Sequence, residues 1–149
     1  MIDSDVLIGF YESLPMETYE TQWKLIKEYI DEGRIVICEA VYNEIKKSEE
    51  LKKWLSQFSK KLVPCYTREV IVEAKTIIND YPKLIDVVNS NDQADPYVIA
   101  LAKINNHTVL SNEYLSEGGK KVKIPFVCKQ LKIACMNTKQ FYKEEKWKF

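Results

Sequence analysis

The apolar positions of the chain alternate between two kinds of spacing. Apolar residues three and four positions apart predict amphipathic helices, whereas uninterrupted apolar runs of three or four residues predict buried strands. Helices are expected at residues 6–11, 18–31, 39–47, 49–58, 96–104 and 124–131, together with one capped by Thr67 that runs to residue 80 and a last one capped by Thr138. Strands are expected at the amino terminus and at residues 35–38, 62–65, 108–110 and 133–136. This alternation predicts an α/β fold, a parallel sheet with helices on both faces.

The composition is that of an ordinary globular protein. At 149 residues, with 46% hydrophobic and 30% charged residues, the chain is expected to form a single domain over residues 1–149. No apolar run approaches the roughly 18 residues that a membrane span needs, and the amino terminus lacks the basic segment of a signal peptide. The four cysteines form no Cys-x-x-Cys pair, which favours buried apolar positions over disulfides or zinc. We therefore expect a cytoplasmic protein that does not enter a membrane.

The net charge of zero conceals an uneven distribution. Residues 1–50 hold 12 acids and 5 bases, whereas residues 118–149 hold 9 lysines and two glutamates. An acidic first part and a lysine-rich last part suit a polyanion-binding protein with a cation site, although the lysines can equally form a solvated face. The zero total argues against tight non-specific binding to duplexes.

Acidic residues recur where predicted strands end and predicted helices begin. Two of them follow the first strand, one lies in the third helix, one precedes the helix at 96–104 and one follows the strand at 108–110: Asp3, Asp5, Glu44, Asp95 and Glu113. The carboxyl ends of parallel strands form the crevice where α/β sheets bind ligands, so we expect the residues after the 108–110 strand to lie on the same edge as Asp3. Because His107 is the only histidine, we expect chemistry at neutral pH to use Mg²⁺ or Mn²⁺ held by carboxylates.

Each of these acids also has a purely structural interpretation. Ser4 or Asp5 can cap the helix that follows, and Asp95 can be an N-cap with Pro96 at the first helical position. Glu44 can be a solvated helix residue and Glu113 the charged tip of a turn. Three further polar residues near the acids are candidates for accessory roles, namely Asp92, Ser111 and Asn112; Asp92 can be either a second acid or a solvated loop residue.

Four short motifs resemble those of PIN domains. Residues 3–8, Asp-Ser-Asp-Val-Leu-Ile, resemble the Asp-Thr-Asn-Val-Leu-Ile opening of that family, and residues 41–45, with Glu44, look like its second motif. Residues 95–102, which start with Asp-Pro, are similar to the third motif, and residues 109–113 to the fourth, usually Thr-Asn-Asp. The Asp-Pro pair, residues 123–128 and the Trp-Lys-Phe ending resemble one PIN-like branch of unknown function, found mostly in prokaryotes.

This resemblance implies a three-layer α/β/α fold whose five-stranded parallel sheet has the order 3-2-1-4-5. It also implies Mg²⁺- or Mn²⁺-dependent cleavage of single-stranded RNA, often by the toxin of a toxin–antitoxin pair and often by a homodimer. Asp3, Glu44 and Asp95 would be metal ligands, Glu113 the fourth acid, and Ser111 would replace the family's threonine.

The chain departs from the family pattern at three places. Asp5 replaces the usual asparagine, Glu113 replaces the commoner aspartate, and only two residues precede Asp3. The short beginning predicts a stunted first strand, which favours a non-catalytic PIN-fold module that binds RNA or a protein. The Asp-x-Asp motif at residues 3–5 also fits a haloacid-dehalogenase-like phosphatase, in which Glu44 would have no role. Three tyrosines beside the acids can stack on bases or pack into the core: Tyr11, Tyr97 and Tyr114.

Overall fold

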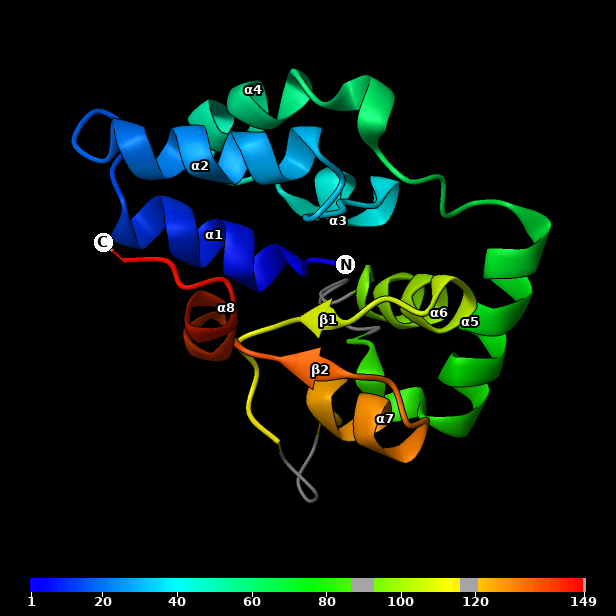
Figure 1. The fold of residues 1–149 in the computed structure, drawn as a ribbon. Helices are drawn as coiled ribbons and strands as arrows, with labels where there is room; N and C mark the ends of the chain where they lie inside the picture. Colours follow the sequence, from blue (N-terminus) through cyan, green and yellow to red (C-terminus); the bar gives the residue numbers. More distant parts are fainter. Residues whose placement is uncertain (87–92, 116–120, 149) are drawn as a thin grey trace.

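The computed structural model describes residues 1–86, 93–115 and 121–148, and this part of the chain is mostly helical (Figure 1). It contains eight α-helices and two short 3-10 helices. They are α1 (Ser4–Ser13), α2 (Glu20–Asp31), α3 (Glu39–Glu44), α4 (Glu49–Ser56), η1 (Ser59–Lys61), α5 (Arg68–Asp80), η2 (Pro82–Leu84), α6 (Asp95–Asn105), α7 (Ile124–Gln130) and α8 (Thr138–Glu144). The predicted helices are therefore confirmed in position, with boundaries that differ by a few residues.

The predicted five-stranded, three-layer α/β/α sheet is wrong. Within the described residues, the sheet consists of two parallel two-residue strands, β1 (Val109–Leu110) and β2 (Cys135–Met136). Two isolated parallel bridges, Ile2 to Leu110 and Cys38 to Val63, lie outside these strands. The strands expected at the amino terminus and at residues 35–38 and 62–65 are reduced to these single bridges.

The extended segments are too short to form a ladder because helices begin directly after them. The first segment ends at Asp3, the N-cap of α1, and the segment at 35–38 ends at Cys38, the N-cap of α3. Single hydrogen bonds, such as the one that the Ile2 amide donates to the Val36 carbonyl at 3.0 Å, hold the short segments beside one another. The chain thus keeps contact between these segments without building a continuous sheet.

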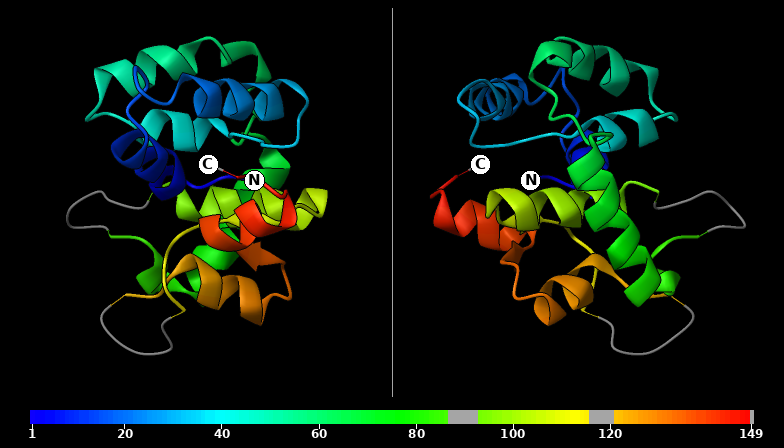
Figure 2. Two further views of the ribbon diagram at one scale, coloured as in Figure 1. Left: turned by 60° about the vertical axis from the view of Figure 1, so that its left-hand side comes forward. Right: turned by 90° about the vertical axis from the view of Figure 1, so that its right-hand side faces the viewer.

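Helices α2, α3 and α4 lie at one end of the molecule, whereas α7 and β2 lie at the opposite end, with α1 and α6 between them (Figures 1 and 2). The core runs through both parts and includes fully buried aliphatic side chains of α1, α2 and α6, among them Leu7, Ile26 and Ile99. Helix α6 packs against α3, α5, α7 and β1. Burial explains why its sequence is apolar on nearly every face.

The helix caps correct several predictions. Thr67 caps α5 as predicted, because its side chain accepts a hydrogen bond from the Val70 amide. Thr138 is not a cap; Asn137 caps α8 in a reciprocal capping box with Gln140. Asp95 is the first residue of α6 and not its N-cap. In the described part of the chain, no helix is both long and apolar enough to cross a membrane.

Candidate carboxylate site

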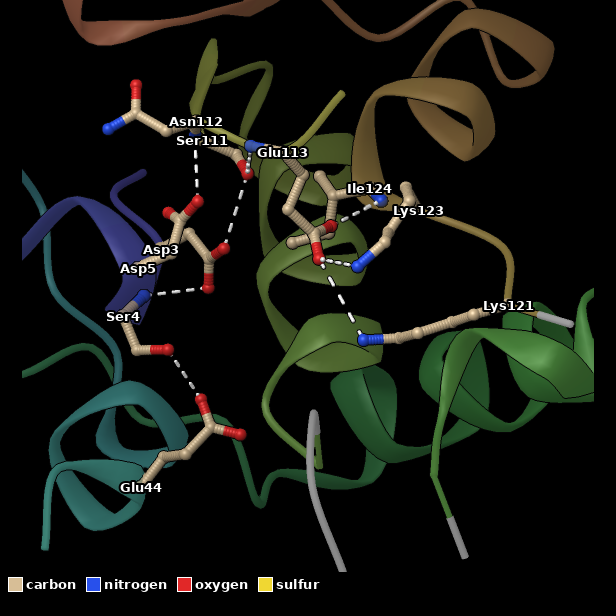
Figure 3. A network of polar contacts seen from close by, with 10 residues as sticks. All are labelled: Asp3, Ser4, Asp5, Glu44, Ser111, Asn112, Glu113, Lys121, Lys123 and Ile124. Atoms are coloured by element: carbon tan, nitrogen blue, oxygen red, sulfur yellow. Dashed lines mark hydrogen bonds and ion pairs between the residues drawn. The ribbon is translucent and has the colours of Figure 1, made fainter. Parts of the chain in front are cut away.

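Acidic side chains from three separated parts of the chain gather around the beginning of α1 (Figure 3). Asp3 and Asp5 come from the start of α1, Glu44 from the last position of α3, and Glu113 from the segment after β1. As the sequence predicted, the residues that follow the strand at 108–110 lie beside Asp3. Hydrogen bonds join these carboxylates to residues of neighbouring segments, and those bonds fix where each carboxylate lies.

Asp3 is the buried centre of the site, with a residue exposure of 3%. It is the N-cap of α1: its Oδ1 atom accepts a hydrogen bond from the Ser4 amide at 2.7 Å. The prediction that Ser4 or Asp5 caps this helix is therefore wrong. The Oδ2 atom of Asp3 accepts a hydrogen bond from the Ser111 hydroxyl at 3.3 Å, so Ser111 joins the segment after β1 to the beginning of α1.

Asp5 lies on the same side and is held by the next residue of that segment. The Asn112 amide donates a hydrogen bond to Asp5 Oδ2 at 2.9 Å, while Asn112 Oδ1 accepts one from the Thr138 amide at 2.9 Å. Asn112 thereby connects the start of α1 to the start of α8. The second oxygen of Asp5, Oδ1, is buried and accepts no hydrogen bond from an N–H or O–H group of the described residues.

Glu44 reaches the site from α3 and points inward, so its interpretation as a solvated helix residue is wrong. Its Oε2 atom accepts a hydrogen bond from the Ser4 hydroxyl at 2.7 Å. Its Oε1 atom is buried and has no hydrogen-bond partner among the described residues. Ser4, which lies between the two aspartates, thus bridges α1 and α3.

Glu113 is engaged on the other side of the segment. Its two carboxylate oxygens accept hydrogen bonds from Lys123 Nζ at 3.1 Å and from the Ile124 amide at 2.9 Å. Lys121 Nζ lies 3.9 Å from the same carboxylate. Glu113 therefore fixes the segment after β1 to the beginning of α7, and the sequence analysis assigned no role to the two lysines that hold it.

Asp95 is buried, at 3% exposure, in the first turn of α6. Helix α6 packs against α3, which carries Glu44, and against β1, which precedes Ser111. These contacts join α6 as a whole to the elements that carry the site; they do not locate Asp95 itself among the other acids. Asp92, the possible second acid of this motif, lies outside the described residues.

Burial and mutual repulsion disfavour the charged forms of the aspartates. Burial, followed by the negative charge of Asp5 and then that of Glu113, raises the pKa of Asp3 well above its usual 3.8. Burial also raises the pKa of Asp5, against the opposing effect of the Asn112 amide. A protonated Asp3 can donate to Asp5, which raises the pKa of Asp3 further, so the lack of a donor at Asp5 Oδ1 applies to the ionised pair. A positive charge placed among these groups would oppose both shifts, because it favours the ionised carboxylates.

The chemistry of the donors fits a hard divalent cation, because carboxylate oxygens are the ligands that Mg²⁺ and Mn²⁺ prefer. The buried oxygens of Asp5 and Glu44 that lack donors are two acceptors available for an ion. In residues 1–86, 93–115 and 121–148, however, no three histidine, cysteine, aspartate or glutamate side chains are close enough together to hold a metal. Ion binding would require these carboxylates to move closer together.

The remaining candidate residues lie around this centre. Tyr114, directly after Glu113, is 86% exposed, so it is not a core residue. Tyr11 donates a hydrogen bond to Glu50, and Tyr97 packs edge-on against Tyr66 at a ring-centroid distance of 5.4 Å. His107 lies before β1, at the strand end opposite Ser111.

Comparison with known proteins identifies the family of the chain. A family model described as a domain of unknown function, DUF4411, matches residues 1–149, so the chain belongs to the DUF4411 family. No match was found among the curated proteins or among the solved structures. The family description assigns no activity.

Proposed function

We propose that the chain is a divalent-metal-dependent ribonuclease that hydrolyses phosphodiester bonds of single-stranded RNA. The observation that supports this proposal best is the pair of buried carboxylate oxygens, Asp5 Oδ1 and Glu44 Oε1, that no donor of the described residues satisfies. Buried acceptors are costly when they lack a partner, and buried carboxylates that repel each other are costlier still. A cation relieves both costs.

Asp3, Glu44 and Asp95 are the proposed metal ligands, as the resemblance to PIN domains implies, and Asp5 is a further ligand suggested by its buried oxygen. A bound Mg²⁺ or Mn²⁺ would offset the charge of a phosphate and lower the pKa of an attacking water. The protein residues would hold and orient the carboxylates. Ser4 positions Glu44, and Ser111 positions Asp3.

The surroundings of Glu113 support a polyanionic substrate. Lys121 and Lys123 place two positive charges beside the acids, where they can contact phosphates that flank the bond to be cut. The exposed ring of Tyr114 provides a surface on which a base can stack. Together these groups suit a flexible, single-stranded chain of nucleotides.

A non-catalytic module that binds RNA or a protein is the second candidate. It is favoured by the internal partners that two of the acids already have, since Ser4 satisfies one oxygen of Glu44 and Lys123 pairs with Glu113. Action as the toxin of a toxin–antitoxin pair, and as a homodimer, is implied by the resemblance alone. Arrest of bacterial growth on expression of the parent chain would support the toxin proposal.

The decisive experiment compares the parent chain with Glu44→Gln on end-labelled single-stranded RNA in Mn²⁺. Glutamine retains an oxygen that can accept the Ser4 hydrogen bond, but it removes the charge that would bind the ion. We expect cleavage by the parent and a loss in the variant of at least the roughly 10–100-fold that removal of even an outer-shell group costs a metal site.

The matched control is Glu49→Gln, which removes the same charge from an exposed position in the first turn of α4 and should cut like the parent. Equal activity in both variants would contradict the assignment of Glu44. If the parent binds RNA but does not cut it, the binding module replaces the nuclease. Hydrolysis of para-nitrophenyl phosphate, a small phosphomonoester, would instead indicate the phosphatase.

A further inference from the structure

A cavity of about 360 Å³ adjoins the carboxylate site, and the two share Ser111 and Glu113. Its other walls come from α7, from β2 with the turn before it, and from the start of α8, which lie together at one side of the molecule (Figure 1). The apolar part includes Pro125 and Met136, and the polar part includes Asn137 and Gln140. A flat ring with polar edges suits such a combination of walls.

The capping box of α8 determines which polar groups Asn137 and Gln140 can offer. Asn137 Oδ1 accepts a hydrogen bond from the Gln140 amide, and Gln140 Oε1 accepts one from the Asn137 amide, both at 2.9 Å. These two bonds fix the orientation of both side-chain amides, because a flip would place an NH₂ group against a backbone N–H. Each residue is exposed and has its NH₂ group left to donate.

From these observations we infer that this cavity is a base-binding pocket for RNA, selective for bases that carry carbonyl oxygens. This inference rests on the proposed function, because it assigns the cavity to a nucleotide beside the bond that is cut. Uracil presents two carbonyl acceptors, whereas the Watson–Crick edge of adenine presents an amino donor beside a ring nitrogen. The side-chain oxygens of Asn137 and Gln140 are both taken up by the capping box, so these two residues can only donate, which favours uracil over adenine.

The test uses uridine and adenosine, nucleosides without a phosphate, so that neither metal nor cleavage is involved. The side-chain NH₂ signals of Asn137 and Gln140 and the methyl signal of Met136 are followed by NMR during titration of the full chain. We expect uridine to shift these signals at lower concentrations than adenosine does. Unchanged signals with uridine, or equal affinity for both nucleosides, would overturn the inference.

Gln140→Glu removes the donor but keeps a side-chain oxygen for the Asn137 amide, so the capping box and the helix are preserved. We expect it to weaken uridine binding about fivefold, which corresponds to the loss of one hydrogen bond. The matched control is Lys139→Gln, which changes the net charge by the same amount at an exposed neighbour that does not line the cavity. Equal effects of the two substitutions would contradict a role for the Gln140 donor.

The outcomes distinguish the pocket from the nuclease. Uridine binding that Gln140→Glu weakens, in a chain that does not cut RNA, supports the pocket and counts against catalysis. RNA cleavage by a chain whose NMR signals do not respond to uridine overturns the pocket and leaves the nuclease proposal intact.

Discussion

At the scale of single residues, Asp5 adds a second carboxylate beside the buried Asp3, at a position where the PIN-domain motif that the sequence resembles has asparagine. Burial raises the pKa of both aspartates. An ionised carboxylate whose pKa is raised in the folded protein lowers the stability of that protein. The contribution of Asp5 to stability is therefore fully present below its unfolded pKa of about 3.8 and is lost as pH rises through its higher folded pKa.

This linkage predicts that Asp5→Asn stabilises the metal-free protein. Asparagine keeps an oxygen for the Asn112 amide but carries no charge, so the gain should be small near pH 4 and larger near pH 8. In EDTA at pH 8 we expect the melting temperature to rise by about 2–4 °C, the change that roughly 1 kcal/mol produces in a domain of this size. Thermal unfolding at both pH values measures the effect.

Asp80→Asn is the control for this prediction, because Asp80 is an exposed residue at the end of α5. The melting temperature of the Asp80→Asn variant should differ little from that of the parent at either pH. A melting temperature for Asp5→Asn that falls below the parent's as pH rises would contradict the assigned direction of the pKa shift. Added Mn²⁺ should stabilise the parent more than the Asp5→Asn variant if the carboxylates bind the ion.

At the scale of secondary-structure elements, two threonines with the same predicted role differ in the structure. Thr67 Oγ1 accepts a hydrogen bond from the Val70 amide and caps α5, whereas Thr138 is preceded by the true cap of α8, Asn137. We expect Thr67→Ala to lower stability by about 1 kcal/mol. Denaturant unfolding of the two alanine variants should separate them.

Thr138→Ala is the matched control. The Thr138 hydroxyl oxygen is buried without a hydrogen-bond partner among the described residues, so its removal eliminates an unsatisfied group and should leave stability unchanged or slightly higher. A loss for Thr138→Ala as large as that for Thr67→Ala would show that Thr138 supports α8 in another way.

The helices were predictable because their signals are local. The pattern at residues 68–80 combines a capping threonine, apolar residues on one face and a following Tyr-Pro pair, and α5 forms there. The strands were not predictable, because a short apolar run such as residues 35–38 does not reveal how many of its residues will pair with a neighbouring strand. Pairing depends on where the next helix begins, and Cys38 caps α3 before a ladder can extend.

The same distinction applies to the candidate site. The prediction that the residues after the 108–110 strand lie beside Asp3 is confirmed. It succeeded because each motif directly follows a predicted strand, and the ends of these two strands do lie side by side. The bridge from Ser4 to Glu44 and the pairing of Lys123 with Glu113 join segments far apart in the sequence. No periodicity or spacing signals such contacts, so only the structure could reveal them.

At the scale of the whole molecule, the fold brings lysines of the last part of the chain close to the candidate site. Glu113, one acid of the candidate site, lies beside Lys121 and Lys123, which immediately precede α7. Lys123 pairs with Glu113, and Lys129, at the end of α7, lines the adjoining cavity. A phosphate chain that crosses the site would therefore meet lysines on its way into or out of a carboxylate cluster.

This arrangement predicts how RNA binding depends on salt. For single strands, each lysine that neutralises a phosphate contributes about 0.7 to the slope of log K against log salt. Replacing both Lys123 and Lys129 with glutamine should reduce the slope by about 1.4 and weaken binding of all RNA sequences alike. Fluorescence anisotropy of a labelled single strand in EDTA, at several salt concentrations, measures both quantities without cleavage.

The control replaces two exposed lysines at the opposite end of the molecule, Lys53 in α4 and Lys60 in η1 (Figures 1 and 2). This variant has the same net charge as the double substitution near α7. If binding responds only to total charge, the two variants will have equal slopes, and the lysines beside the carboxylates will not be the RNA contact. If binding depends on where the lysines lie, the slope will fall only for the variant that lacks Lys123 and Lys129, because counterions are released where the phosphates lie.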